Sequence, residues 1–173
     1  MLFKRLAILC LTFFFYNCNQ KDSIENNQLI IVLDAVIKHD DSLHIYYLNN
    51  ESIQFSKSKK FWLKVNGNKK NQPIKIKLPT NNKTKSIRID FGNNPKNDKI
   101  ILNKISLKYN KKTLELKGKE IYYYFNIDVN NTVIDNNSGV LSRKNLKDKK
   151  GPTIYPKGQK LFKKLKILYQ SNE

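Results

Sequence analysis

The sequence predicts an all-β fold, an antiparallel β-sandwich of the jelly-roll kind, in a single domain over residues 29–173. Two observations predict it. Apolar and polar side chains alternate along several short segments, and turn-forming residues separate these segments at spacings of about ten residues. Alternation with a period of two is typical of half-buried strands, because successive side chains of a strand point to opposite faces of the sheet. A chain of 173 residues is long enough for one domain with its own core.

The N-terminus has the pattern of a secretory signal. Lys4 and Arg5 precede an apolar run over residues 6–16, which is too short to span a membrane stably and gives way abruptly to polar residues. We therefore expect residues 1–17 to be a signal peptide, and the folded domain to begin after it.

The end of this signal resembles a bacterial lipobox. In such a sequence the cysteine is acylated and becomes the new N-terminus, so the resemblance of residues 15–18 implies a lipid anchor on Cys18 and contact with a membrane through that lipid. Tyr16 and Asn17 are larger than the residues that usually precede the lipobox cysteine, although some Gram-negative groups have relaxed lipoboxes. Conventional signal cleavage or an uncleaved anchor is the alternative.

A short polar tract follows the cysteine. Gln20, Lys21 and Asp22 resemble the export signal that sends lipoproteins of some Gram-negative bacteria to the outer face of the outer membrane. The resemblance implies a location in the cell envelope, as an outer-membrane lipoprotein that is exposed at the surface; a generic polar tether is the alternative. Residues 18–28 are expected to form the acylated cysteine and a flexible tether, of which residues 19–28 reach roughly 33 Å when extended.

The predicted strands follow from Leu29 onward. Residues 29–33 are apolar at both odd and even positions, which is typical of a central strand buried on both faces. Alternation predicts further, half-buried strands over residues 61–65, 74–78, 87–91, 105–109 and 114–116. Asparagine, glycine and proline mark the turns between them, as in residues 92–95.

A short C-terminal helix is predicted over residues 160–169. Leu161, Leu165 and Leu168 recur there at helical spacing among lysines. A final strand through the same segment is the alternative.

Several of these segments resemble β-sandwich modules of bacterial cell-surface and polysaccharide-handling proteins. They are Ile45-Tyr46-Tyr47, residues 76–79, and residues 87–92 followed by 100–107. Such modules are similar to carbohydrate-binding jelly rolls. The resemblance implies the fold more directly than a function.

Aromatic side chains on the polar parity of strands are the candidate ligand contacts. Trp62 shares its parity with lysines, one of the neighbours Tyr46 and Tyr47 must point away from the core, and Tyr122 and Tyr124 share one parity. Sugar rings stack on flat aromatic faces because both surfaces leave water favourably. Ordinary packing between the sheets is the alternative.

The formal net charge of +19 predicts attraction to anionic polymers and surfaces. Lys64, Lys75 and Lys77 fall on the outward parity and indicate a cationic sheet face. A solvated face is the alternative, in a chain whose lysine and asparagine content follows A/T-rich codons. Nucleic acid is not an expected partner, because only three of the 33 cationic residues are the arginines that phosphate recognition favours.

The sequence carries no motif for catalysis, a metal or a cofactor. Both cysteines lie within the first 18 residues, so the domain is expected to have no disulfide. His39 and His44 are five residues apart, on opposite faces of a strand, and a solvated turn is expected there rather than a metal site. Residues 128–139 lack the glycine and the closing glutamate of an EF-hand, which leaves a loose calcium site as the alternative to a plain loop.

Two functions are therefore expected. The first is a non-catalytic module that binds glycans, in particular acidic ones; the alternative is a structural or partner-binding lipoprotein of an envelope complex. An enzyme is not expected, because no nucleophile elbow and no phosphate-binding loop occurs.

Overall fold

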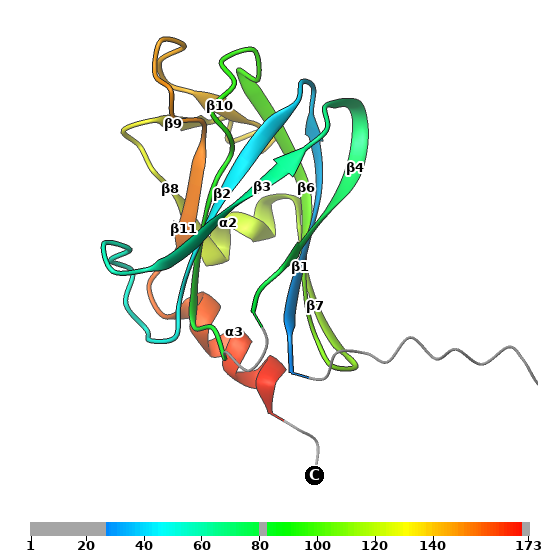
Figure 1. The fold of residues 1–173 in the computed structure, drawn as a ribbon, viewed down its shortest axis with the longest axis vertical. Coiled ribbons are helices and arrows are strands. Elements are labelled where there is room, and N and C mark those ends of the chain that lie inside the picture. The colour runs from blue at the N-terminus through cyan, green and yellow to red at the C-terminus, as the bar shows by residue number, and fades with distance from the viewer. Residues whose placement is uncertain (1–26, 80–82, 171–173) are drawn as a thin grey trace, which may run out of the picture.

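Two antiparallel β-sheets pack face to face in the computed structural model of the protein (Figure 1). The structure describes residues 27–79 and 83–170. The proposed signal peptide, Cys18 and the tract Gln20, Lys21 and Asp22 lie outside the described residues. Within the described ranges, no helix has the length and apolar character needed to cross a bilayer. The predicted antiparallel sandwich is confirmed.

The first sheet is built around β1 and β6. Its order is β4-β1-β6-β10-β9, and β7 also pairs with β6. The strands are β1 (Leu29–Ile37), β4 (Asn68–Lys77), β6 (Lys99–Tyr109), β7 (Lys112–Lys117), β9 (Thr132–Ile134) and β10 (Leu141–Arg143). β1 is a central strand, as predicted, but Ile30 and Val32 on its outer face are only half buried. The expectation of burial on both faces was wrong, because residues 27–79 and 83–170 place no further layer over this side.

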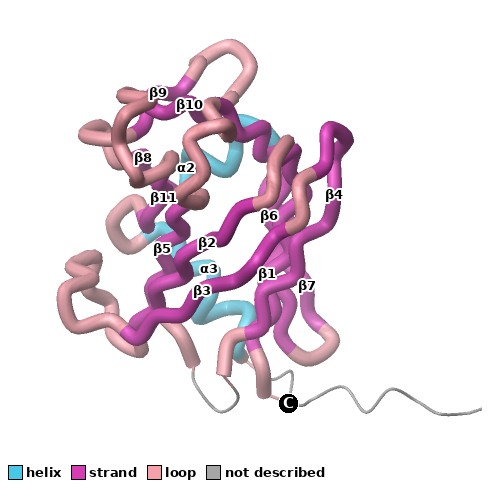
Figure 2. The backbone as a smooth tube through the Cα atoms, turned by 45° about the horizontal axis from the view of Figure 1, so that its top comes forward, coloured by secondary structure: helices cyan, strands magenta, loops and turns pink. Residues whose placement is uncertain are grey.

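The second sheet has the order β3-β2-β5-β11-β8 (Figure 2). Its strands are β2 (Asp41–Leu48), β3 (Lys59–Val65), β5 (Ser86–Asp90), β8 (Phe125–Ile127) and β11 (Thr153–Pro156). All of its pairings are antiparallel. Residues that the register places directly opposite one another on neighbouring strands have their side chains on the same face of this sheet.

The core lies between the sheets. Leu33 and Ile105 of the first sheet and Ile45 and Ile89 of the second are fully buried. Ile89 and Ile105 belong to the alternating positions that predicted strands, since each strand turns every second side chain inward.

The predicted C-terminal helix is α3 (Lys160–Tyr169). It lies across one end of the sandwich and contacts β6, β7 and β11 (Figure 1). Leu161, Leu165 and Leu168 face the core. The helix is therefore confirmed, and the alternative of a final strand is wrong.

The segment around Tyr122 and Tyr124 is helical instead of extended. A 3-10 turn, η2 (Gly118–Glu120), leads into the one-turn helix α2 (Ile121–Tyr124). Ile121 and Tyr124 are buried because residues three apart lie on the same side of a helical turn. The alternation expected of a strand does not apply to these residues, because side chains of a helix return to the same face about every 3.6 residues and those of a strand every two.

Candidate ligand-binding face

The outer face of the second sheet carries a cluster of aromatic and charged side chains. Strand register places His44 between Trp62 on β3 and Asp90 on β5. One step along, it places Tyr46 between Lys60 and Arg88. We call this group the aromatic platform; its members are His44, Tyr46, Lys60, Trp62, Arg88 and Asp90.

Trp62 is held from one side by His44. The two rings stack with centroids 3.9 Å apart and an interplanar angle of 18°. The Tyr46 hydroxyl and the His44 Nδ1 share a hydrogen bond of 2.8 Å. Trp62 nevertheless remains 51% exposed. Its indole is thus a flat, supported surface that is open to a ligand.

The surroundings of His44 favour the neutral form of its ring. Burial is the main influence and lowers its pKa, while Asp90 acts in the opposite direction and Lys60 and Arg88 reinforce the lowering. A neutral ring can accept the hydrogen bond of the Tyr46 hydroxyl at Nδ1.

Arg88 is fixed by Asp90. Its Nε and Nη2 donate to the two carboxylate oxygens at 2.7 and 3.1 Å. The guanidinium carbon lies 5.1 Å from the centroid of the Tyr46 ring, and the Lys60 ammonium lies 6.0 Å from the same centroid. Bidentate pairing and contact with an aromatic ring keep the cation at a defined place beside the platform.

The platform brings together some of the residues predicted as ligand contacts. Trp62 and Tyr46 belong to it, and the exposed Lys64 lies two residues along β3 on the same face. Lys75 and Lys77 are exposed too, but they lie on β4, at the edge of the other sheet. The predicted single cationic face is therefore divided between two sheets.

Three predicted aromatic contacts do not lie on the platform. Tyr47 and Tyr124 point into the core and are 6% and 8% exposed. Tyr122 is half buried, and its hydroxyl donates to the carbonyl oxygen of Gly139 at 2.6 Å. Their positions correspond to the alternative of ordinary packing, and we leave them out of the proposed site.

The platform also contains residues that sequence reasoning missed as contacts, namely His44, Lys60, Arg88 and Asp90. A signal was present, since Arg88 and Asp90 alternate with Ile87 and Ile89. What the sequence lacks is the register that sets β5 against β2. Without that register, the alternation along a strand predicts which face of the sheet a side chain lies on, but not which side chains of other strands lie beside it.

The turn at His39 and Asp40 is exposed, and the Asp41 carboxylate beside it orders the neighbouring loop. One oxygen of the Asp41 carboxylate accepts the backbone N–H groups of Ser42, Asn93 and Asn94, and the other accepts the side-chain amide of Asn97. Gly92 has φ +74°, and a Cβ there would lie 2.1 Å from this carboxylate. Three side chains able to share a metal do not occur together anywhere in residues 27–79 and 83–170.

Arg143 lies beside the loop that the Asp41 carboxylate orders. It is buried and donates to the carbonyl oxygens of Asn94, Asn97 and Asp148 at 3.0–3.1 Å. Burial lowers its pKa, against an opposing effect of Asp41 and Asp148. This arginine joins two loops and is not available to a ligand.

The two ends of residues 128–139 form separate local turns. Asp128 accepts the N–H of Asn130 at 3.1 Å, and Asp135 accepts the N–H of Asn137 at 2.8 Å. Each carboxylate is thus used within its own turn.

No protein-family model, curated protein or solved structure matches this chain.

Proposed function

We propose that the protein is an exported lipoprotein, anchored through Cys18, whose domain binds acidic glycans on the aromatic platform without catalysis. The observation that carries the proposal is the half-exposed Trp62, which is stacked on His44 beside a fixed Arg88. The indole can receive the apolar face of a sugar ring, and the neighbouring cation can receive a carboxylate or sulfate of the same chain.

The platform is ordered before a ligand arrives. His44 and Tyr46 hold each other by a hydrogen bond, and Asp90 holds Arg88. Ordering a mobile side chain on binding costs roughly 0.5–1.5 kcal/mol of binding free energy, and fewer side chains of the platform have to be ordered in this way. Such preorganisation favours a binding role over incidental exposure of one aromatic residue.

Charge supports an acidic ligand. Lys60 and Lys64 are exposed on the same strand as Trp62. Their attraction for an anionic polymer is long-ranged and needs no fixed geometry. Stacking on Trp62 would contribute on the order of 1 kcal/mol, so we expect a dissociation constant between about micromolar and millimolar.

The proposal is tested by retention on an immobilised uronic-acid polysaccharide and on its neutral counterpart, at low and high salt. We expect retention on the acidic polymer alone, and we expect salt to weaken it. Trp62→Ala should reduce retention about fivefold or more, because a stacking contribution of about 1 kcal/mol corresponds to a factor of about five in affinity. Tyr123→Ala is the control, since Tyr123 is an aromatic side chain of similar exposure (55%) that lies off the platform. Retention that salt removes but that Trp62→Ala leaves unchanged would reduce the result to a basic surface and contradict the proposal.

A second function is favoured by a different observation. Val129, Val133 and Leu146 are 49–64% exposed on the segments around β9 and β10, at the end opposite α3 (Figure 1). Exposed apolar side chains at one end suit a protein partner in an envelope complex. Absence of polysaccharide retention, together with a protein crosslinked in cells through position 146, would favour this function over glycan binding.

A further inference from the structure

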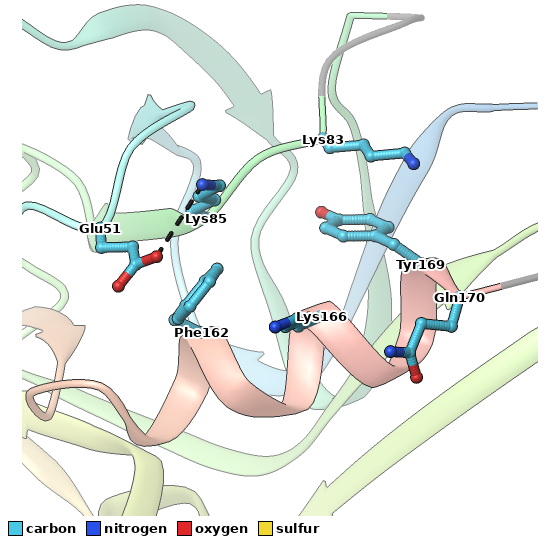
Figure 3. A pocket seen from close by; sticks show the side chains of 7 residues that line it. All are labelled: Glu51, Lys83, Lys85, Phe162, Lys166, Tyr169 and Gln170. Atoms are coloured by element: carbon cyan, nitrogen blue, oxygen red, sulfur yellow. Dashed lines mark ion pairs between the residues drawn. The ribbon is translucent and has the colours of Figure 1, made fainter.

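A cationic pocket lies between α3 and the segment that leads into β5 (Figure 3). Its volume is about 430 Å³. Three lysines and two aromatic side chains line it, together with one acid: Lys83, Lys85, Lys166, Phe162, Tyr169 and Glu51. With three cations against one carboxylate, the pocket attracts anions.

The walls of the pocket are fixed by contacts on both sides. The Tyr169 hydroxyl donates to the carbonyl oxygen of Thr84 at 2.7 Å, which ties α3 to the segment before β5. The Lys85 ammonium lies 5.2 Å from the centroid of the Phe162 ring and 3.9 Å from the Glu51 carboxylate. Figure 3 shows Phe162 pointing from the helix toward Lys85 and Tyr169 pointing toward Lys83, with Lys166 on the helix between them.

The pocket lies at the end of the domain where the described chain begins. The Asn27 N–H donates to the Asn110 side chain at 2.9 Å, and the Tyr109 hydroxyl donates to the Asn27 side chain at 3.1 Å. The Tyr109 ring in turn meets Tyr169 of α3, edge to face, at 4.8 Å. A chain held by a lipid on Cys18 would therefore be attached at the end that carries α3 and this pocket, within the reach of the tether.

Charge is distributed unevenly between the two ends. α3 carries four lysines and no acid, and Lys111 adds a further exposed cation at the turn between β6 and β7. At the opposite end, the start of β2 and the turns and loops next to β2, β6, β8, β9 and β10 carry six aspartates: Asp40, Asp41, Asp98, Asp128, Asp135 and Asp148. Six lysines lie among them: Lys38, Lys96, Lys144, Lys147, Lys149 and Lys150. The lysines of α3 are thus not offset by acids of the same helix, whereas the lysines of the opposite end lie among aspartates.

An apolar side chain accompanies these cations. Ile167 is 60% exposed on α3 and borders a second hollow of about 380 Å³ with Lys112, Leu114 and Lys164. Lysines around an exposed apolar residue are typical of helices that lie on anionic membranes, where the cations meet headgroups and the apolar group enters the interface.

We propose that the α3 end of the domain docks on an anionic phospholipid surface, and that the pocket between Lys83, Lys85 and Lys166 receives a lipid phosphate. The inference rests on the proposed anchor for the orientation of the domain, and it is independent of glycan binding. Its partner is defined by charge: the surface offers phosphodiester groups that the lysines neutralise. Docking would hold the platform at a fixed height and angle above the membrane.

The test uses the full chain, inserted through its own N-terminus into lipid nanodiscs of phosphatidylcholine, with or without phosphatidylglycerol. The measurement is amide hydrogen exchange over residues 160–170. We expect exchange of α3 to slow several-fold in the discs that contain phosphatidylglycerol. The double variant Lys83→Glu/Lys166→Glu should remove this difference.

The control variant is Lys69→Glu/Lys70→Glu, which makes the same change of net charge on the exposed start of β4. It should keep the protection of α3. Equal exchange in the two kinds of disc would overturn the proposal, and so would equal loss of protection in both double variants. Protection produced by inorganic phosphate in phosphatidylcholine discs would overturn the assignment to a lipid. Failure of the anchor is distinguishable, because it would release the protein from both kinds of disc.

Discussion

At the scale of single residues, the structure separates the two histidines by their surroundings. His39 is exposed in a turn, whereas His44 is half buried between Trp62 and Tyr46. A protonated His44 would face Lys60 and Arg88 on the neighbouring strands, and only Asp90 would oppose them. The platform therefore favours the neutral imidazole.

This preference predicts a pH-dependent signal. The folded-state pKa of His44 lies below its ordinary value of 6.5, so the unfolded chain binds the proton more tightly. The contribution of His44 to stability is fully present above pH 6.5 and is lost as the pH falls through the folded-state pKa. Because Trp62 is the only tryptophan, its fluorescence should be quenched as His44 becomes charged, with a midpoint below pH 6.5.

The histidine variants decide whether His44 is the source of that signal. His44→Gln should abolish the titration of the fluorescence, and His39→Gln should leave it unchanged. A midpoint at or above 6.5 would show that the site does not disfavour the charged ring.

At the scale of elements, α3 closes one end of the core. Leu165 is completely buried, while Ile167, on the opposite side of the same helix, is 60% exposed. Burial of a leucine side chain contributes roughly 1.5–3 kcal/mol relative to exposure. The helix is held mainly by this apolar stripe, since a segment of ten residues is too short to be stable alone in water.

Leu165→Ala is therefore expected to lower the free energy of unfolding by about 2–5 kcal/mol, because it removes buried methyl groups and leaves a cavity. Ile167→Ala is the matched control and should change it by less than about 0.5 kcal/mol. Urea denaturation followed by circular dichroism measures both. Similar losses for the two variants would mean that α3 is not packed as described.

The elements also show what the sequence could predict. Strands with clean alternation, such as Ile87 to Phe91, were predicted, since their pattern depends only on one buried and one wet face. The leucine stripe of α3 was predicted for the same reason. α2 was missed, because one helical turn of Ile-Tyr-Tyr-Tyr is too short to show a period.

The candidate site was only half predictable. Parity placed Trp62 and one of Tyr46 and Tyr47 on an outer face, and the structure shows that Tyr46 is the outward one. Parity could not say that Lys75 and Lys77 belong to a different sheet, nor that Arg88 and Asp90 stand beside Tyr46 and His44. Those relations depend on long-range register, which hydrophobic pattern and turn geometry determine only when strands are adjacent in the chain.

At the scale of the whole molecule, the sandwich has two chemically distinct ends and one aromatic side. The α3 end is cationic and lies where the described chain begins, the opposite end gathers aspartates and exposed valines, and the platform occupies the outer face of the second sheet. This arrangement suits a domain that is tethered at one end and recognises ligands on its side.

Anchoring itself is predicted to depend on Cys18. Metabolic labelling with a fatty-acid analogue should mark the wild-type protein and should be lost in Cys18→Ser, because acylation requires the thiol. Cys10→Ser is the control, since Cys10 lies within the apolar run of the proposed signal peptide. Equal labelling of wild type and Cys18→Ser would contradict the lipoprotein assignment.

The pairing of β1 has a consequence for biosynthesis. β1 is the first strand of the domain to be made, yet its partners are β4 and β6, and Ile31 faces Leu107, which follows it by 76 residues. At roughly 5–20 residues per second, a ribosome needs about 4–15 seconds to supply that partner. Ile76 of β4, the partner on the other edge, is made earlier, so during this interval at least one edge of an apolar strand stays open to other chains. High expression is therefore expected to favour aggregation through β1, and a chaperone that shields this strand would protect the newly made protein.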